Sequence, residues 1–503
     1  MAQLPVGSSL ISGGGPEKPF WGRKREVIKG PMKILMASTE MAPLAQTGGL
    51  GEVVAALSLA LQEQGHAVSV VLPLYRSIRE SAAIEPTSVS IAVPVGGRRM
   101  AAEIFQTTTA EGIQVFLVGR DEYFDRSGLY GVAGGRGYDD NAERFIFFSR
   151  AVVELACHMD PPPDLIHCHD WPTALVPVFL KERGLPFGSV LTLHQLAHQG
   201  CFDGADFSLT HLAGHYYHDL EFHGQINFLK AGILHADALV AVSERFAREV
   251  LQPGGGHGLD GVLRGQARKL WGILNGNGAS SWDPARDPCL PAPYSPSAME
   301  GKLRCRAALL ETLGLEPDKA GPVFAAQGTG GFLPALVDQL LADDSRLIVL
   351  SDVPLNSREL RVAQRRHAGK LALLECPDET LLRRTLAAAD LMILPPPLEP
   401  SGISIQRALK YGAVPITEAV GGLSELIRDE DPTLGKNGSG NGFVCYDKTP
   451  EALADTLRRA KKVYRRPREW AALRERGMKT DFSWLTTARR YVQVYQTVSP
   501  VSV

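Results

Sequence analysis

The chain has 503 residues, enough for two large domains or three ordinary ones, and this length excludes a small disulfide-stapled protein. Apolar residues make up 44% of it and charged residues 21%, which is typical of globular proteins and excludes bulk disorder and fibrous repeats. Because 53 Lys and Arg residues nearly balance 55 Asp and Glu residues, no overall field draws the chain to nucleic acid or to an anionic membrane. A phosphate-bearing ligand must therefore be met by local groups.

The beginning of the chain predicts no targeting segment. Residues 1–31 are rich in Gly, Pro and charge, and they lack the compact apolar stretch of a secretory signal. No apolar run approaches the roughly 20 residues that a membrane helix needs. Seven scattered cysteines without a C-x-x-C pair are typical of reduced thiols. We therefore expect a loose leader and a cytoplasmic protein with no membrane partner.

The string His167-Cys168-His169-Asp170 contains residue types that bind metals. Neighbouring residues on a strand point to opposite faces, so these side chains do not converge on one ion. We expect no metal at this position.

An alternation of strand, turn, helix and strand follows the leader. Residues 33–37 form a short apolar run, a Gly-rich turn follows at 47–51, and an apolar helical pattern covers 53–61. The next apolar run, 67–73, has the length of a buried strand. This order predicts a doubly wound parallel sheet. Further buried strands are expected at 114–118, 165–168, 189–193 and 238–242.

A second series of apolar runs begins near residue 322, after the proline-rich connection 282–294. The predicted fold is therefore α/β, with two Rossmann-like domains facing each other across a cleft. Strands of the second domain are expected at 323–326, 347–350, 371–374, 391–394 and 414–416. The predicted organisation is a leader (1–31), an N-terminal domain (32–280), a C-terminal domain (281–483) and a helix that packs back across the hinge (484–503).

A short motif occurs in both halves. Residues 47–52 read TGGLGE, and residues 420–425 read VGGLSE. Gly-Gly before a helix can leave backbone N–H groups free to meet an anion or a sugar hydroxyl at the positive end of the helix. The alternative is a pair of tight turns that need positive φ, and the spacing alone favours neither interpretation. Neither motif is G-x-G-x-x-G or a P-loop, which disfavours NAD-binding and Walker-type ATPase functions.

A series of motifs runs through residues 32–495. In the first half they are STEMAP (38–43), TGGL (47–50), YFDR (123–126), DDNAERF (139–145), IHCHDW (166–171), FLKAG (228–232), HGLDG (257–261) and GILNG (272–276). In the second half they are EPSG (399–402), ALKYG (408–412), GGL (421–423) and DFSW (481–484). In this order they resemble the bacterial glycogen and starch synthases, the ADP-glucose-dependent glucosyltransferases of glycosyltransferase family 5, which have the GT-B fold.

The resemblance implies a retaining transfer of glucose from ADP-glucose to the non-reducing 4-hydroxyl of an α-1,4-glucan. The nucleotide sugar and the glucan are then the expected partners, and no cofactor is expected. As the bond to the diphosphate breaks, charge grows on an oxocarbenium-like sugar and on ADP. The family neutralises the phosphates with a Lys before TGGL, with an Arg and a Lys after the first strand of the second domain, and with backbone amides. Each such donor contributes about 2.7 to 4 kcal/mol by the measure of one oxyanion-hole donor.

The sugar-side positions of the family are mostly present. By resemblance, Asp170 helps to form the acceptor and sugar site, although a carboxylate there could equally cap a helix. His194, at the end of the 189–193 strand, corresponds to the histidine that contacts the transferred glucose, whereas a lone His would ordinarily be a core residue. Glu399 corresponds to the essential acidic residue, which makes His194, Asp170 and Glu399 the predicted catalytic residues. The predicted donor and substrate-binding residues are Gln46, Thr47, Gly48, Gly49, Asn275, Gly402, Gly421 and Gly422.

The phosphate side departs from the family. Gln46 replaces the Lys before TGGL, which keeps a hydrogen-bond donor and loses the charge, and Glu52 replaces an Asp. Residues 327–334 read QGTGGFLP where the family carries its Arg and Lys, and no Lys or Arg occurs between Lys319 and Arg346. Losing two such cations would cost on the order of 5 to 8 kcal/mol if additive, about 10⁴ to 10⁶ in rate.

Two hypotheses follow. The first is a working glucosyltransferase with a remodelled donor site, in which the amides of Gly328, Gly330 and Gly331, together with Lys230 or another distant cation, hold the phosphates. The second is a catalytically impaired or inactive descendant that binds glucan or partners a genuine synthase. Family membership favours the first.

Overall fold

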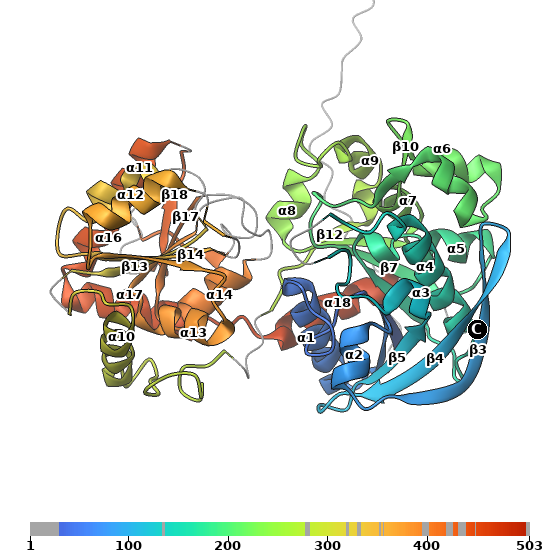
Figure 1. Ribbon diagram of the computed structural model, residues 1–503, viewed down its shortest axis with the longest axis horizontal. Coiled ribbons are helices and arrows are strands. Elements are labelled where there is room, and N and C mark those ends of the chain that lie inside the picture. The colour runs from blue at the N-terminus through green and yellow to red at the C-terminus, as the bar shows by residue number, and fades with distance from the viewer. Residues whose placement is uncertain are drawn as a thin grey trace, which may run out of the picture.

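The computed structural model describes residues 30–132, 136–276, 282–317, 321–328, 333–351, 354–355, 357–394, 402–418, 426–430, 439–447 and 449–498. Figure 1 shows two lobes, one built from the first half of the chain and one from the second half. Residues 1–29 of the expected leader lie outside the described residues.

The first lobe is built on a nine-stranded sheet in the order β12-β11-β7-β6-β1-β2-β5-β4-β3. From β12 to β5 all neighbours are parallel, and their apolar sequences are buried, as expected for strands covered on both faces. The strands are β1 (Lys33–Ala37), β2 (Ala67–Pro73), β3 (Glu85–Val95), β4 (Arg98–Thr108), β5 (Gln114–Gly119), β6 (Leu165–His169), β7 (Gly188–Leu193), β11 (Ala238–Ala241) and β12 (Leu270–Gly272).

Helices connect these strands and cover the sheet (Figure 1). They are α1 (Gly49–Glu63), α2 (Arg76–Ser81), α3 (Asp121–Phe124), α4 (Asn141–His158), α5 (Val176–Glu182), α6 (Tyr217–Leu220), α7 (Phe228–His235), α8 (Glu244–Glu249) and α9 (Asp260–Gly265). A small antiparallel sheet beside them has the order β8-β10-β9 and consists of β8 (Cys201–Asp203), β9 (Glu221–Phe222) and β10 (Gln225–Asn227).

The edge of the large sheet differs from the predicted all-parallel arrangement. β3 and β4 form a long antiparallel hairpin, and β4 also pairs antiparallel with β5. β3 alternates buried and exposed residues near its end and carries Pro86 and Pro94, so it lacks the continuous apolar run of a central strand. Proline has no backbone N–H to donate to a strand ladder, and an edge strand tolerates this because one of its sides is unpaired. The uniform parallel sheet expected from the sequence is therefore wrong at this edge.

The second lobe contains a six-stranded parallel sheet in the order β15-β14-β13-β16-β17-β18. Its strands are β13 (Val323–Gln327), β14 (Arg346–Ser351), β15 (Leu371–Glu375), β16 (Leu391–Leu394), β17 (Val414–Glu418) and β18 (Phe443–Cys445). Its helices are α10 (Glu300–Thr312), α11 (Leu333–Leu340), α12 (Arg358–Arg366), α13 (Glu379–Ala388), α14 (Ile403–Lys410), α16 (Pro450–Tyr464) and α17 (Pro467–Lys479). Counted along the chain, this strand order is 3-2-1-4-5-6, the doubly wound order of Rossmann domains.

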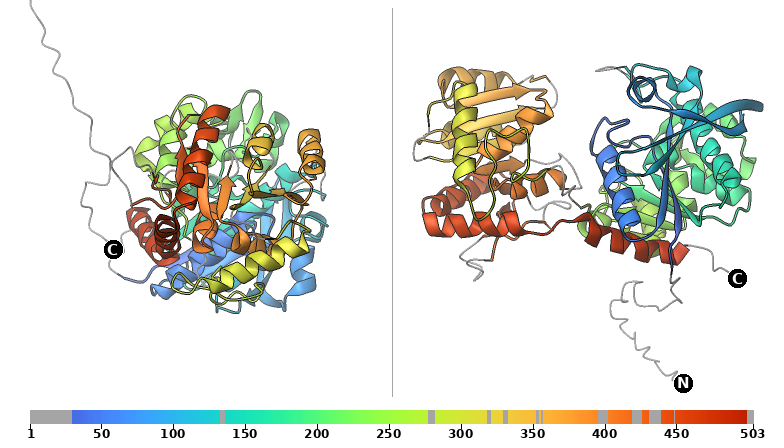
Figure 2. Two further views of the ribbon diagram at one scale, coloured as in Figure 1. Left: turned by 90° about the vertical axis from the view of Figure 1, so that its left-hand side faces the viewer. Right: turned by 90° about the horizontal axis from the view of Figure 1, so that it is seen from below.

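The last helix, α18 (Trp484–Val498), leaves the second lobe and lies against the first (Figure 2, right). Its buried residues Trp484, Ala488, Tyr491, Val494 and Tyr495 belong to the same apolar core as β1 and β6. The helix also contacts α1 and β7. The first lobe is thus completed by residues from the far end of the chain. No helix in the described ranges is long and apolar enough to cross a membrane.

Candidate active site

The site predicted on the first lobe lies where the strand order reverses. β1 has β2 on one side and β6 on the other, so the chain leaves these strands in opposite directions around the sheet. In open α/β sheets such a switch point, at the carboxyl ends of the strands, is the ligand-binding crevice. The loop from Ser38 follows β1, Asp170 follows β6, and His194 follows β7. The structure therefore brings the predicted residues of three separate segments to one edge.

Asp170 is buried and holds the backbone of the neighbouring loop. Its Oδ1 accepts a hydrogen bond from the N–H of His194 over 2.8 Å. It precedes the short 3₁₀ helix Trp171–Thr173 without a capping bond from its side chain, so the helix-cap alternative is wrong. Its φ of 56° is unusual for a residue other than glycine, and such strain clusters at functional sites. Burial raises the pKa of its carboxyl to about 7, although hydrogen bonds from the backbone oppose the shift.

His194 is half-buried and adjoins two fully buried histidines, His167 and His169. Its Nε2 lies 3.0 Å from the Nδ1 of His169, and the rings of His169 and His167 are 4.2 Å apart. The Nδ1 of His167 in turn lies 2.8 Å from the hydroxyl of Tyr495 on α18. Burial lowers the pKa of His194 and of His167 to about 3, so both rings are neutral at physiological pH. A neutral His194 can exchange hydrogen bonds with sugar hydroxyls through its remaining ring nitrogen.

The Thr47-Gly48-Gly49 turn is held by an acidic side chain that the sequence analysis left out of the site. Glu40, which is buried, accepts hydrogen bonds from the N–H of Thr47 over 2.6 Å and from the N–H of Gly48 over 3.3 Å. The Thr47 hydroxyl also donates to Glu40 over 2.8 Å. The interpretation that the Gly-Gly amides are free for an anion is therefore wrong for Gly48. Glu40 lies in the loop that follows β1, and this position is the signal that could have identified it.

The glycines of this turn are not explained by backbone conformation. Gly48 has a φ of −159°, and neither Gly49 nor Gly51 has a positive φ, so the tight-turn alternative is wrong for this motif. The glycines of the 420–425 motif lie outside the described residues. A Cβ at Gly51 would meet the backbone of Ala42 at 3.2 Å, which explains that glycine by packing. A Cβ at Gly48 would meet no atom of the described residues within 4 Å. The open space over Gly48 is suited to close approach by a ligand.

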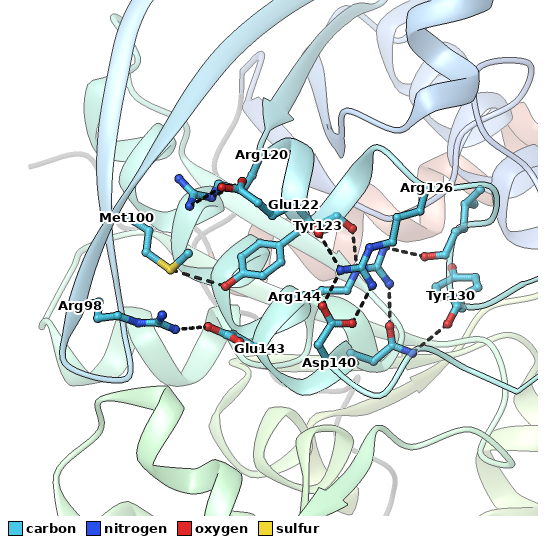
Figure 3. A network of polar contacts seen from close by, with 12 residues as sticks. Arg98, Met100, Arg120, Glu122, Tyr123, Arg126, Tyr130, Asp140, Glu143 and Arg144 are labelled. Atoms are coloured by element: carbon cyan, nitrogen blue, oxygen red, sulfur yellow. Dashed lines mark hydrogen bonds and ion pairs between the residues drawn. The ribbon is translucent and has the colours of Figure 1, made fainter.

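A polar network fixes the loop behind the turn (Figure 3). Tyr130 donates a hydrogen bond to Glu40 over 2.8 Å, and Tyr130 itself sits on the loop between α3 and α4. Arg144 is fully buried and donates to the carbonyls of Tyr123 in α3 and of Leu129 in that loop, and Arg126 forms a two-pronged ion pair with Asp140 (Figure 3). Bidentate arginine–carboxylate pairs fix geometry as well as charge. The YFDR and DDNAERF motifs therefore act through Tyr130 on Glu40.

The predicted donor residues Asn275 and Gly402 lie where the two lobes meet. Asn275 is 1% exposed, and its carbonyl accepts a hydrogen bond from Gln406 Nε2 of α14 over 2.8 Å. Gly402, with a φ of 72°, precedes α14. Among the described residues, the side-chain amide atoms of Asn275 and the Oε1 of Gln406 are buried without a hydrogen-bond partner. Native proteins rarely leave such atoms unpaired, so these atoms are suited to a polar ligand or to water.

The remaining residues named in the sequence-based predictions either make contacts other than those expected or lie outside the described residues. The Nζ of Lys230, which was proposed to contact the phosphates, donates to the carbonyls of His218 and Glu221, so two of its three N–H groups are engaged within the first lobe. Gln46 is exposed and bonds the carbonyl of Gly48 and the Oε1 of Glu52. The residues outside the described ranges are Glu399, Gly421, Gly422, Gly330 and Gly331. No group of three His, Cys, Asp or Glu in the described part of the chain could hold a metal ion.

Comparison with solved structures identifies the class. The catalytic domain of starch synthase IV from Arabidopsis thaliana, bound to ADP and acarbose, superimposes with a TM-score of 0.84 at 28% identity, covering 94% of this chain and 100% of that one. The sucrose-phosphate synthase of Thermosynechococcus elongatus shares the fold at a TM-score of 0.55 and 16% identity, covering 92% of this chain and 98% of that one. The two doubly wound lobes and the site at the switch point therefore define a GT-B glycosyltransferase.

Sequence comparison narrows the class to one family. Residues 33–265 match the model of the starch synthase catalytic domain, and residues 359–475 match that of glycosyl transferases group 1. The glycogen synthase of Geotalea uraniireducens is 37% identical over 92% of this chain and 98% of its own length. That of Anaeromyxobacter dehalogenans is 38% identical over 93% of this chain and 100% of its own length. The chain belongs to the glycogen and starch synthase family, and the resemblance seen in its motifs is confirmed.

Proposed function

We propose that the protein transfers glucose, with retention of configuration, from ADP-glucose to the non-reducing 4-hydroxyl of an α-1,4-glucan. The observation that carries this proposal is the convergence of Asp170, His194 and the Glu40-held turn at the switch point of the first sheet. The relatives named glycogen synthase, and a related structure bound to ADP and acarbose, support the choice of donor and acceptor. We further propose that the reaction takes place in the cytoplasm, where the seven cysteines, which form no disulfide, would stay reduced. We also propose that the reaction needs no cofactor.

The described residues have the chemistry that such a transfer needs near the sugar. The Asp170 carboxylate, once ionised, favours positive charge developing on the anomeric carbon. Neutral His194 orients hydroxyls without adding a competing positive charge. Glu40 is committed to the turn, so its role is to hold the Gly48 surface in place rather than to contact the reacting atoms.

The test is incorporation of radiolabelled glucose from ADP-glucose into glycogen by the purified full-length protein. We expect incorporation above that of a Glu399→Ala control, and release of one ADP for each glucose transferred. UDP-glucose in place of ADP-glucose tests the nucleotide preference, and we expect it to be the poorer donor. Incorporation no greater than in the control would refute the proposed activity.

The alternative of a non-catalytic descendant rests on the missing cations of residues 327–334 and on Gln46. This alternative predicts that the protein is retained on glycogen in a pull-down, shows no turnover, and has little affinity for ADP-glucose by calorimetry. Tight nucleotide binding together with turnover excludes it.

A further inference from the structure

Arg407 joins the two lobes beside the TGGL turn. It lies on α14, and its Nη2 forms an ion pair with Glu52 in the first turn of α1. The Arg407 side chain is 13% exposed and that of Glu52 is 36% exposed, so the guanidinium is largely shielded from solvent and the carboxylate is partly open to it. Ile403, at the start of α14, packs into the core of the first lobe and lies 3.7 Å from the position of a Cβ on Gly49. The first turn of α1 therefore meets α14 at two points: Gly49 at Ile403, and Glu52 at Arg407 in the last turn of α14.

The guanidinium of Arg407 is fixed by an aromatic ring. Its central carbon lies 3.9 Å from the ring centroid of Trp282, and that of Arg383 lies 4.0 Å from the same centroid. Two guanidinium groups this close to one indole must occupy its two faces. Arg383 is itself held by Asp287 over 3.1 Å. Trp282 is therefore clamped, and Arg407 is oriented before any ligand arrives.

Arg407 has unused hydrogen-bonding capacity. Its Nε is buried and has no partner among the described residues. The preceding residue, Gln406, and its partner Asn275 carry the other unpaired polar atoms of the donor side. A buried guanidinium N–H without an acceptor is costly, and an anionic ligand would remove that cost.

The two segments in which the family carries its phosphate-binding cations, residue 46 and residues 327–334, contain no Lys or Arg in this chain. The neutral side chain of Gln46 donates a hydrogen bond to the Oε1 of Glu52 over 3.2 Å, while Arg407 pairs with the Oε2 of the same carboxylate. The turn after β13 contributes no Lys or Arg, since none occurs between Lys319 and Arg346. Glu52 is thus an anion placed beside a permanent cation, next to a turn in which a Cβ on Gly48 would meet no described atom within 4 Å.

We propose that Arg407 binds the diphosphate of the nucleotide sugar, and that Glu52 is the partner that Arg407 exchanges for the diphosphate. This inference rests on the proposed function, because it assigns a residue to the donor side of that site. It supplies the cation whose absence from residues 327–334 makes the donor site deficient. Binding then replaces an Arg407–carboxylate pair with an Arg407–phosphate pair, and the Nε of Arg407 gains an acceptor.

Calorimetric titration of the full-length protein with ADP tests the exchange. Arg407→Met removes the charge and keeps an apolar side chain against Trp282, so we expect ADP affinity to fall about ten- to a hundredfold. Glu52→Gln frees Arg407 and removes a repelling charge, so we expect ADP affinity to rise. Arg407→Lys should recover part of the loss. Arg366→Met, which removes an arginine from an exposed ion pair on α12, is the matched control and should leave ADP affinity unchanged.

The signs of the two effects separate this role from a simple contact between lobes. If the pair only held the lobes together, Arg407→Met and Glu52→Gln would break the same contact and shift ADP affinity in the same direction, which would overturn the proposal. Wild-type ADP affinity in the Arg407→Met variant would overturn it as well, even if glucose transfer to glycogen is observed. A wild-type protein that binds no ADP would refute the proposed function together with this inference.

Discussion

The carboxylate of Asp170 accepts a hydrogen bond from the backbone N–H of His194 over 2.8 Å, and this bond ties the end of β6 to the end of β7. Both residues therefore keep their places at the switch point without help from a ligand. The same burial that shields this bond raises the pKa of the Asp170 carboxyl to about 7. The chemistry of the site thus depends on pH through this group.

We expect kcat/KM to rise with pH through an apparent pKa of about 7, because the ionised carboxylate stabilises the positive charge that grows on the sugar. The pKa values of His194 and His167, at about 3, place the transitions of these two site histidines below this range. The measurement is a pH–rate profile of the wild type and of Asp170→Asn. The variant should be slow and lack the acid limb, and a limb that persists in it would contradict this assignment.

Stability should depend on the same group with the opposite sign. The folded pKa of Asp170 lies above its ordinary value of 3.8, so between about pH 4 and 7 the unfolded chain binds fewer protons than the folded chain. The contribution of Asp170 to stability therefore falls as pH rises through this window and is constant above it. Tm measured from pH 5 to 8 should fall more for the wild type than for Asp170→Asn, and parallel curves would argue against the raised pKa.

The Tyr130 hydroxyl, which bonds Glu40 over 2.8 Å and Thr39 over 2.7 Å, positions the TGGL turn. Tyr130→Phe should lower kcat/KM about fivefold, since a net hydrogen bond is worth about 1 kcal/mol. Tyr217→Phe is the control, because in the described part of the chain the Tyr217 hydroxyl has no hydrogen bond and its ring packs on Phe207. An equal loss in both variants would indicate a general effect of removing a hydroxyl.

Gly48→Ala tests the open surface of the turn. The extended φ of Gly48 suits alanine and no described atom lies within 4 Å of the new Cβ, so we expect Tm to stay within about 2 °C of the wild type. The methyl group occupies ligand space, so KM for the donor or the acceptor should rise. Gly265→Ala, which also meets no described neighbour and has no positive φ, should leave both Tm and KM unchanged. Wild-type kinetics in Gly48→Ala would show that no ligand approaches this glycine.

Gln46→Lys returns a positive charge to a position beside Glu52. We expect it to tighten ADP binding by up to about tenfold, because a charged hydrogen bond to phosphate replaces a neutral one. The control is Gln114→Lys at an exposed position on β5, which adds the same charge far from the turn. The same gain in both variants would show a long-range field effect and not a contact.

The parallel strands were predictable because burial on both faces demands short continuous apolar runs. The run at 323–326, for example, is β13 extended by one residue to Gln327. The β3–β4 hairpin was missed because its alternating polar residues and its prolines look like a loop. Asp170 and His194 could be placed because each directly follows a buried strand. Arg407 could not, since a charged residue on a helix ordinarily faces solvent. Only the tertiary packing of the second lobe places it against Trp282, and only the contact between the lobes places it beside Glu52.

The last helix makes the first lobe depend on the final residues of the chain. A fragment ending at residue 276 would lack α18 and would expose the apolar surface that Tyr491 and Tyr495 cover, and His167 would lose its bond to Tyr495. During synthesis on the ribosome, the amino-terminal half therefore cannot reach its final packing until the carboxyl-terminal half has been made. Dissection of this enzyme into halves thus calls for co-expression of the 484–498 segment with the first lobe.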